Sequence, residues 1–140
     1  MHGEMSTFLI YPTYYSSGDS TLRYILVECE GMALSRFGYP NDEGLGEHRL
    51  YDKGLKDVLG IAEVKESEFL DEYERMCRRS HERIWGGRGM LSQVPNAPSG
   101  KRHFVLSFKE NVFEALCDGL RLVGTFTDFS SAFDDAKERI

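Results

Sequence analysis

The chain has no run of apolar residues that approaches the ~20 needed to cross a membrane as a helix. Cysteine is also scarce, since Cys29, Cys77 and Cys117 lie far apart and form no C-x-x-C pair. An odd number of cysteines without zinc-ligand spacing argues against a disulfide framework and favours a reducing compartment. The first residues, MHGEM, contain no cationic start and no apolar segment, so we expect no secretory signal. We therefore expect a cytoplasmic protein without a membrane anchor.

Positive charge is in short supply. Lysine and arginine number 17 against 23 aspartates and glutamates, which gives a formal net charge of −6. Nucleic-acid binding needs a positive surface that neutralises phosphates, so we expect no nucleic-acid partner. The one basic concentration could recognise an acidic partner or a phosphate, but a solvated helix face is the preferred interpretation. It consists of Arg75, Arg78, Arg79, Arg83 and Arg88.

What is present is the composition of an ordinary folded domain. Of 140 residues, 41% are hydrophobic and 12% are aromatic, and aromatic residues favour sheets and packed cores. A chain of this length buries about 68–70% of its unfolded surface, which suffices for one core. We expect a single domain over residues 1–140. Met5 is as good a start as Met1, so residues 1–5 are expected to be disordered or foreign to the natural protein.

The clearest secondary-structure signal is a hairpin over residues 103–118. A two-residue turn at Glu110-Asn111 would place Phe108 opposite Phe113, Leu106 opposite Ala115 and Phe104 opposite Cys117. These apolar residues then share one face, because side chains alternate along a strand. On the other face the same register places Ser107 opposite Glu114 and His103 opposite Asp118.

The remaining elements complete a mixed fold. We expect strands near residues 7–15, 22–29, 32–37, 59–64 and 120–126, with Pro12 favouring an edge position for the first. Glu30-Gly31 predicts a tight turn that pairs Val27 with Leu34 and Tyr24 with Phe37, and one long bulged strand through Gly31 is the alternative. The fold class predicted is α+β, with an antiparallel sheet of about five or six strands whose one face takes two helices.

The two helices are predicted from capping residues and apolar spacing. Ser67 caps a long amphipathic helix over residues 67–84, whose stripe includes Cys77. A C-terminal helix over residues 130–140 is capped by Ser130 or Ser131. Between the third strand and the long helix, residues 38–55 form an ordered loop with one helical turn near 50–55, and residues 86–101 form a second long loop.

The sharpest site prediction is the pair His103 and Asp118. Directly opposed residues have Cβ atoms about 4.5–5.5 Å apart, and a carboxylate beside an imidazole orients the ring for acid–base chemistry. An ordinary polar pair at the open end of a hairpin is the competing interpretation. Glu114 lies on the same face, and a loop folded across it would add further polar side chains. The loop candidates are Asp42, Glu43 and His48.

Other chemistry has weaker signals. His81 falls on the shoulder of the long helix, where a satisfied hydrogen bond is the simplest role. No metal-ligand spacing such as H-E-x-x-H occurs, so we expect no metal and no cofactor. No G-x-S-x-G motif marks a nucleophilic serine. Gly86-Gly87-Arg88-Gly89 lacks the ending of a phosphate-binding loop, and a linker explains it better.

One stretch resembles a pattern in small uncharacterised bacterial proteins. It consists of GYPNDE at 38–43, HRLY at 48–51 and GL at 54–55, followed by a serine-capped helix with a histidine near its end. His103-Phe104 and Phe108 to Phe113-Glu114 continue the pattern, which spans about residues 36–117. The resemblance implies a free-standing bacterial cytosolic domain with no assigned activity. It draws attention to His48, His81, His103 and Glu114.

Three function classes remain open at the level of sequence. The first is a non-catalytic binding or protein-interaction domain that forms a homodimer through a sheet edge or an apolar face. The second is a small enzyme or ligand- or metal-binding domain that uses the His103, Asp118 and Glu114 face beneath the 38–55 loop. The third is an inhibitor or immunity-type partner of another protein, which the acidic loop and the negative charge favour.

Overall fold

A computed structural model describes residues 6–14, 22–38, 48–54, 60–85, 100–108 and 111–140. Along the chain the secondary-structure elements, of which η2 is a short 3-10 helix, are β1 (Thr7–Tyr14), β2 (Leu22–Glu30), β3 (Leu34–Gly38), η2 (Tyr51–Lys53), β4 (Ile61–Val64), α1 (Glu68–Trp85), β5 (Arg102–Ser107), β6 (Val112–Cys117), β7 (Gly119–Phe126) and α2 (Phe129–Arg139). The predicted α+β class with antiparallel strands is confirmed. The strands form two sheets, in the orders β1-β2-β7 and β3-β6-β5-β4, where one sheet was expected. The predicted loop residues 39–47 and 86–99 lie outside the described part.

Two segments of the chain pass from one sheet to the other, one from β2 to β3 and one from β6 to β7. β2 does not pair back onto β3: Val27 lies opposite Leu122, and Phe37 lies opposite Phe113. The predicted hairpin with Val27 against Leu34 is therefore wrong. The alternative of one long strand through Gly31 is not found either, because the strand is interrupted at residues 31–33 and its two parts belong to different sheets. Gly31 has a positive φ of 59°, a conformation that glycine adopts without strain. The amide of Asp118 donates to the carbonyl of Glu30 across the bend, at 2.8 Å.

The β5–β6 hairpin was predicted with the right faces and the wrong register. Leu106 lies opposite Phe113, Phe104 opposite Ala115 and His103 opposite Leu116, which is two residues away from the predicted pairing. The hairpin closes where the amide of Phe108 donates to the carbonyl of Asn111 at 2.8 Å, before the predicted turn. Because the shift is an even number, every side chain keeps its predicted face. The couple of His103 with Asp118 is wrong.

The main core lies between the two sheets. It contains Cys29, Phe104, Leu106, Phe113, Ala115 and Cys117, all buried. Tyr11 of β1 reaches over β5, where its hydroxyl donates to the carbonyl of Ser107 at 2.6 Å. Pro12 faces no pairing problem because β1 is an edge strand, as predicted. Each fully buried leucine such as Leu106 contributes about 1.5–3 kcal/mol of hydrophobic stabilisation.

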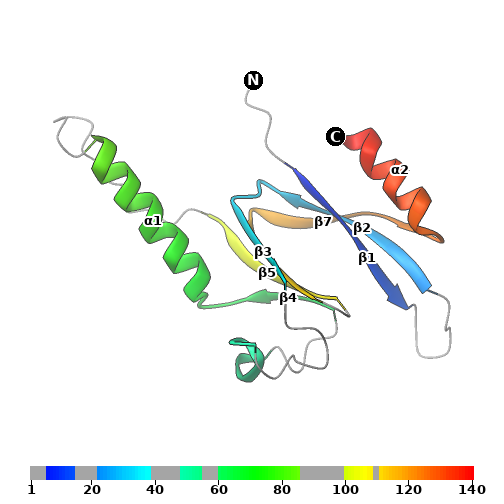
Figure 1. Cartoon of the computed structure of the whole chain (residues 1–140), viewed down its shortest axis with the longest axis horizontal. Helices are drawn as coiled ribbons and strands as arrows, with labels where there is room; N and C mark the ends of the chain where they lie inside the picture. The colour runs from blue at the N-terminus through cyan, green and yellow to red at the C-terminus, as the bar shows by residue number, and fades with distance from the viewer. Residues whose placement is uncertain (1–5, 15–21, 39–47, 55–59, 86–99, 109–110) are drawn as a thin grey trace.

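The two helices lie on different sheets, whereas both were expected on one face (Figure 1). α2 packs on β1, β2 and β7 through the buried Ala132 and Ala136. Its N-cap is Asp128, whose carboxylate accepts from the amide of Ser131 at 2.8 Å, so the predicted serine caps are wrong. Within the described residues, no helix is both long and apolar enough to span a membrane.

α1 begins beside β5 and extends away from the sheets (Figure 1). Ser67 is its N-cap as predicted, because its Oγ accepts from the amide of Leu70 at 3.0 Å. Phe69 in the first turn is buried, but Met76 and Ile84 are each 51% exposed and Cys77 is exposed. The prediction that places Cys77 on the buried stripe of α1 is therefore wrong, since Met76, Cys77 and Ile84 lack cover from the described part of the chain.

Candidate functional site

The outer face of the β5–β6 hairpin carries both apolar and ionisable side chains. Alternation along the strands directs Phe104 and Leu106 into the core between the sheets, so His103 and Val105 face the opposite way. Glu114 of β6 lies opposite Val105 and shares this face. Leu50 packs on Val105, and the first turn of α1 places Phe69 over His103. His103 is 1% exposed and Glu114 is 6% exposed.

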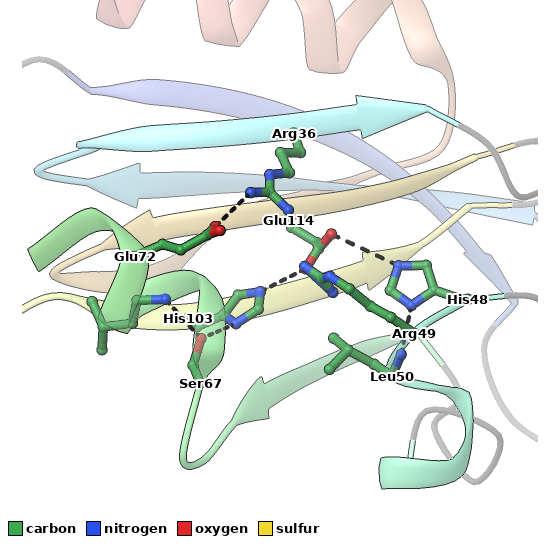
Figure 2. A network of polar contacts seen from close by, with 9 residues as sticks. Arg36, His48, Arg49, Leu50, Ser67, Glu72, His103 and Glu114 are labelled. Carbon is green, nitrogen blue, oxygen red and sulfur yellow. Dashed lines mark hydrogen bonds and ion pairs between the residues drawn. The ribbon is translucent and has the colours of Figure 1, made fainter. Parts of the chain in front are cut away.

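A row of three polar side chains runs through this buried face (Figure 2). The Nε2 atom of His103 lies 2.8 Å from Oε1 of Glu114. On the other side of the ring, Nδ1 lies 2.7 Å from Oγ of Ser67. Because Oγ of Ser67 already accepts from the amide of Leu70, its hydroxyl proton is free to point at Nδ1. A neutral imidazole then donates from Nε2 to Glu114 and accepts at Nδ1 from Ser67.

Two residues of the 48–54 segment also converge on Glu114 (Figure 2). Nη2 of Arg49 lies 2.5 Å from Oε1 of Glu114, and Nε2 of His48 lies 3.7 Å from Oε2. Burial opposes ionisation of the Glu114 carboxyl, but the hydrogen bond from His103 and the charge of Arg49 outweigh it. The pKa of Glu114 therefore lies below its ordinary value. The face holds a carboxylate that is buried and charged.

His48 is held as the neutral ring. Its Nδ1 accepts from the amide of Leu50 at 3.1 Å, which requires this nitrogen to be deprotonated. Burial lowers the pKa of His48, and the nearby carboxylate of Glu114 offsets this only in part. The segment around η2 is thus attached to the sheet through His48, Arg49 and Leu50.

An aromatic and cationic stack closes one side of His103. The ring of Phe69 packs edge-on against the imidazole, with 5.2 Å between the ring centroids. The guanidinium of Arg36 lies 3.9 Å from the centre of the Phe69 ring and 3.2 Å from a carboxylate oxygen of Glu72. These contacts join β3, the first turns of α1 and β5, and they restrict the orientation of the His103 ring.

A pocket of about 330 Å³ opens beside this row. Both Ser67 and His103 line it, although each of the two side chains is buried. The lining also includes an apolar set and a charged set. The apolar set is Leu50, Ala62, Val64, Phe69 and Val105, and the charged set is Arg49, Lys53, Glu63, Lys65, Glu66 and Glu68. A volume above roughly 300 Å³ is typical of small-ligand sites.

The predicted site residues separate into three groups. His103, Glu114 and His48 lie together in the buried network. Asp118 lies outside it, 49% exposed, with its carboxylate 2.8 Å from the Lys101 ammonium. His81 lies more than three helical turns beyond Ser67 on α1. Asp42 and Glu43 are not among the described residues, so their part in the site stays a prediction.

Sequence reasoning missed two members of the network. Arg49 directly follows His48 and needed only the tertiary contact of the segment with β6 to be recognised. Ser67 was identified as a helix cap, but its contact with His103 spans 36 residues and leaves no local pattern. The predicted pairing of Ser107 with Glu114 is wrong, because Ser107 lies opposite Val112.

Comparison of the chain with models of protein families, with curated proteins and with solved structures found no match. The resemblance to small bacterial proteins therefore stays a prediction. Among the described side chains, no three of His, Cys, Asp or Glu are grouped to hold a metal ion. What the site presents chemically is a hydroxyl, an imidazole and a carboxylate in series beside a pocket.

Proposed function

We propose that the protein is an interaction domain that works as a homodimer, with α1 as its contact surface. The observation that carries this proposal is the exposure of the apolar stripe of α1. Met76 and Ile84 each leave 51% of their surface in solvent, although the helix is strongly amphipathic. An amphipathic helix gains most of its stability from burying its apolar face, so such a face calls for a partner.

The charge pattern of α1 favours a second copy of the chain as that partner. The acidic residues gather toward the start of the helix and the basic residues follow them: Glu68, Asp71, Glu72 and Glu74 precede Arg75, Arg78, Arg79 and Arg83, and Glu82 is the exception. Two such helices packed antiparallel bring the acidic half of each opposite the basic half of the other. A two-fold axis generates this arrangement without further requirements, because each contact then occurs twice.

The positions of the charges beside the stripe agree with this packing. Glu72, Met76, Arg79 and Arg83 follow one another at spacings of four, three and four residues and so lie on one side of the helix. With the axis close to Met76, Glu72 of one copy comes opposite Arg79 of the other. Glu72 already contacts Arg36, but both side chains are about half exposed or more and such a pair is weak.

Light scattering coupled to size-exclusion chromatography tests the proposal. We expect a mass of twice the 16.0 kDa of one chain for the natural protein and of one chain for Met76→Glu. Met76 is half exposed, so its replacement leaves the fold intact, which circular dichroism checks. Ile140→Glu is the matched control, because Ile140 is 91% exposed at the C-cap of α2 and the dimer should persist.

Charge reversal tests the antiparallel arrangement. Arg79→Glu should weaken the dimer, and the double variant Glu72→Arg, Arg79→Glu should restore it because the opposed charges are exchanged. A natural protein with the mass of one chain at every concentration refutes the homodimer. A dimer that withstands Met76→Glu shows that copies meet elsewhere and removes α1 from the proposal.

A further inference from the structure

The row of Ser67, His103 and Glu114 has the order of groups that acyl-transfer enzymes use. A serine hydroxyl lies within 2.7 Å of one imidazole nitrogen, and a carboxylate lies within 2.8 Å of the other. In that chemistry the imidazole accepts the hydroxyl proton, and the carboxylate fixes the tautomer and stabilises the imidazolium. Here Nδ1 faces the Ser67 hydroxyl, and the ionised carboxylate of Glu114 holds Nε2–H, so both requirements are met.

The backbone around Ser67 presents the hydroxyl at a strand–turn–helix junction. β4 ends at Val64, Ser67 caps α1, and the turn between them contains Glu66 with a φ of +50°. A non-glycine residue in the left-handed region is strained, and such residues cluster where a side chain must be aimed for function. Sharp turns between a strand and a helix are also where serine hydrolases expose their nucleophile.

The pocket lies directly beside this serine. Ser67 and His103 both line it, next to apolar side chains from three other elements or segments. Leu50 comes from the segment before η2, Val64 from β4 and Val105 from β5. An uncharged ester with a short apolar acyl group suits this lining better than a charged substrate, because the lining cations are matched in number by acids.

We propose that Ser67 is the nucleophile of an esterase site and that His103 is its general base. Oγ of Ser67 forms a bond to the acyl carbon while its proton moves to Nδ1 of His103. The bond from the acyl carbon to the alcohol oxygen breaks, and the alcohol leaves with the proton from His103. Water then attacks the acyl-serine and gives its proton to His103. The bond between the acyl carbon and Oγ of Ser67 breaks, the carboxylic acid is released, and Oγ takes back a proton from His103.

In this scheme Glu114 is a positioning residue, because it acts through His103. It holds Nε2–H of the ring, and so leaves the Nδ1 lone pair directed at Ser67. Arg49 and His48 in turn orient the carboxylate. The activity goes beyond the proposed homodimer and does not depend on it, since the network lies at the opposite end of α1 from Ile84.

Covalent labelling with a fluorophosphonate tests the nucleophile, because this reagent modifies serines that an adjacent base activates. We expect one label per folded chain, on the peptide that contains Ser67 by mass spectrometry. Ser131 is a matched control serine in the natural chain: it lies at the start of the other helix, and its hydroxyl contacts the Asp128 carboxylate at 3.0 Å instead of an imidazole. It should stay unlabelled.

Hydrolysis of p-nitrophenyl acetate supplies the second readout. Ser67→Asn keeps an oxygen that can cap α1, so the helix start is retained while the nucleophile is lost. We expect this variant to lose labelling and all hydrolysis above the level of free imidazole. His103→Gln should lower the rate by about 100- to 10,000-fold, the range typical for loss of a general base. Glu114→Gln should shift the pH profile of hydrolysis, which a purely structural role would not do.

Two results would overturn the proposal. One is a folded protein in which Ser67 stays unlabelled while a serine protease in the same sample is labelled. The other is a Ser67→Asn variant that hydrolyses the ester as fast as the natural protein. Either result assigns Ser67 to capping α1 and nothing more.

Discussion

Glu114 illustrates how a charge can be kept inside a sheet. A carboxylate loses its hydration when it is buried, and the loss is tolerable only when partners replace the water. Three side chains do so here: His103 from the neighbouring strand, and His48 and Arg49 from the segment before η2. Because these partners come from distant parts of the chain, Glu114 also fixes where that segment lies on the sheet.

The stability of the protein should fall as the pH is lowered, in two steps. The folded pKa of His48 lies below its ordinary value of 6.5, so the unfolded chain binds a proton first and stability declines below about pH 6.5. The folded pKa of Glu114 lies below 4.5, so a second decline begins near pH 4.5. Glu28, Glu63 and Asp128 add to the second step, because their pKa values are lowered as well.

Urea unfolding between pH 4 and pH 8 measures this dependence. His48→Gln should remove the first step and leave the second, because glutamine does not titrate. The assignment of the first step to His48 fails if the variant and the natural protein decline in parallel between pH 6.5 and pH 5.

For individual residues, the sequence predicted correctly that His103 and Glu114 share a face, but it predicted the wrong cross-strand partner for His103. Alternation placed His103 and Glu114 on one face, and the structure confirms this because the register error was even. Which residue His103 meets depends on the register, and Glu110-Asn111 was a weak turn signal compared with Asn-Gly. The contact of His103 with Ser67 depends on the packing of α1 against β5, which no local pattern encodes.

Among the elements, the bend between β2 and β3 shows the limit of local rules most clearly. Glu30-Gly31 has the composition of a tight turn, and the glycine does adopt a positive φ. The chain nevertheless continues onward, because β7 pairs with Tyr24–Glu30 and β6 pairs with Leu34–Gly38 on the two sides of the bend. A tight turn and a continued chain are equally compatible with the local sequence, and the pairing with distant β6 and β7 selects the second.

Gly31→Ala should destabilise the protein by about 1–3 kcal/mol, since alanine is strained at a φ of +59°. A Cβ there would also meet Oδ2 of Asp118 at 2.0 Å and disturb the contact of Asp118 with Lys101. Gly38→Ala at the end of β3 is the matched control: its Cβ would meet nothing within 4 Å, and the change should stay below about 1 kcal/mol. Equal unfolding free energies of the two variants, measured in urea, would contradict this account of the bend.

At the scale of the whole molecule, the three cysteines report how the layers are arranged. Cys29 and Cys117 are fully buried between the sheets, whereas Cys77 lies exposed on α1. A hydrogen bond with Cys117 together with burial raises the pKa of Cys29, so its thiolate is disfavoured as well as shielded.

A thiol reagent should therefore modify one cysteine per chain rapidly in dilute native protein, and all three after unfolding in urea. Mass spectrometry should assign the fast site to Cys77, and Cys77→Ser should abolish it. Fast modification of Cys29 or Cys117 under native conditions would mean that the two sheets separate readily.

The pairing of β2 with β7 has a consequence for how the chain is made. Tyr24 finds its partner in Phe126, about a hundred positions later. Loop-closure entropy makes such distant pairings slow to form. During synthesis one side of β2 must therefore remain unpaired until β7 (Gly119–Phe126) has left the ribosome. A shortened product that stops before β7 would expose that side to other nascent chains, so premature termination is where this architecture is most prone to aggregate.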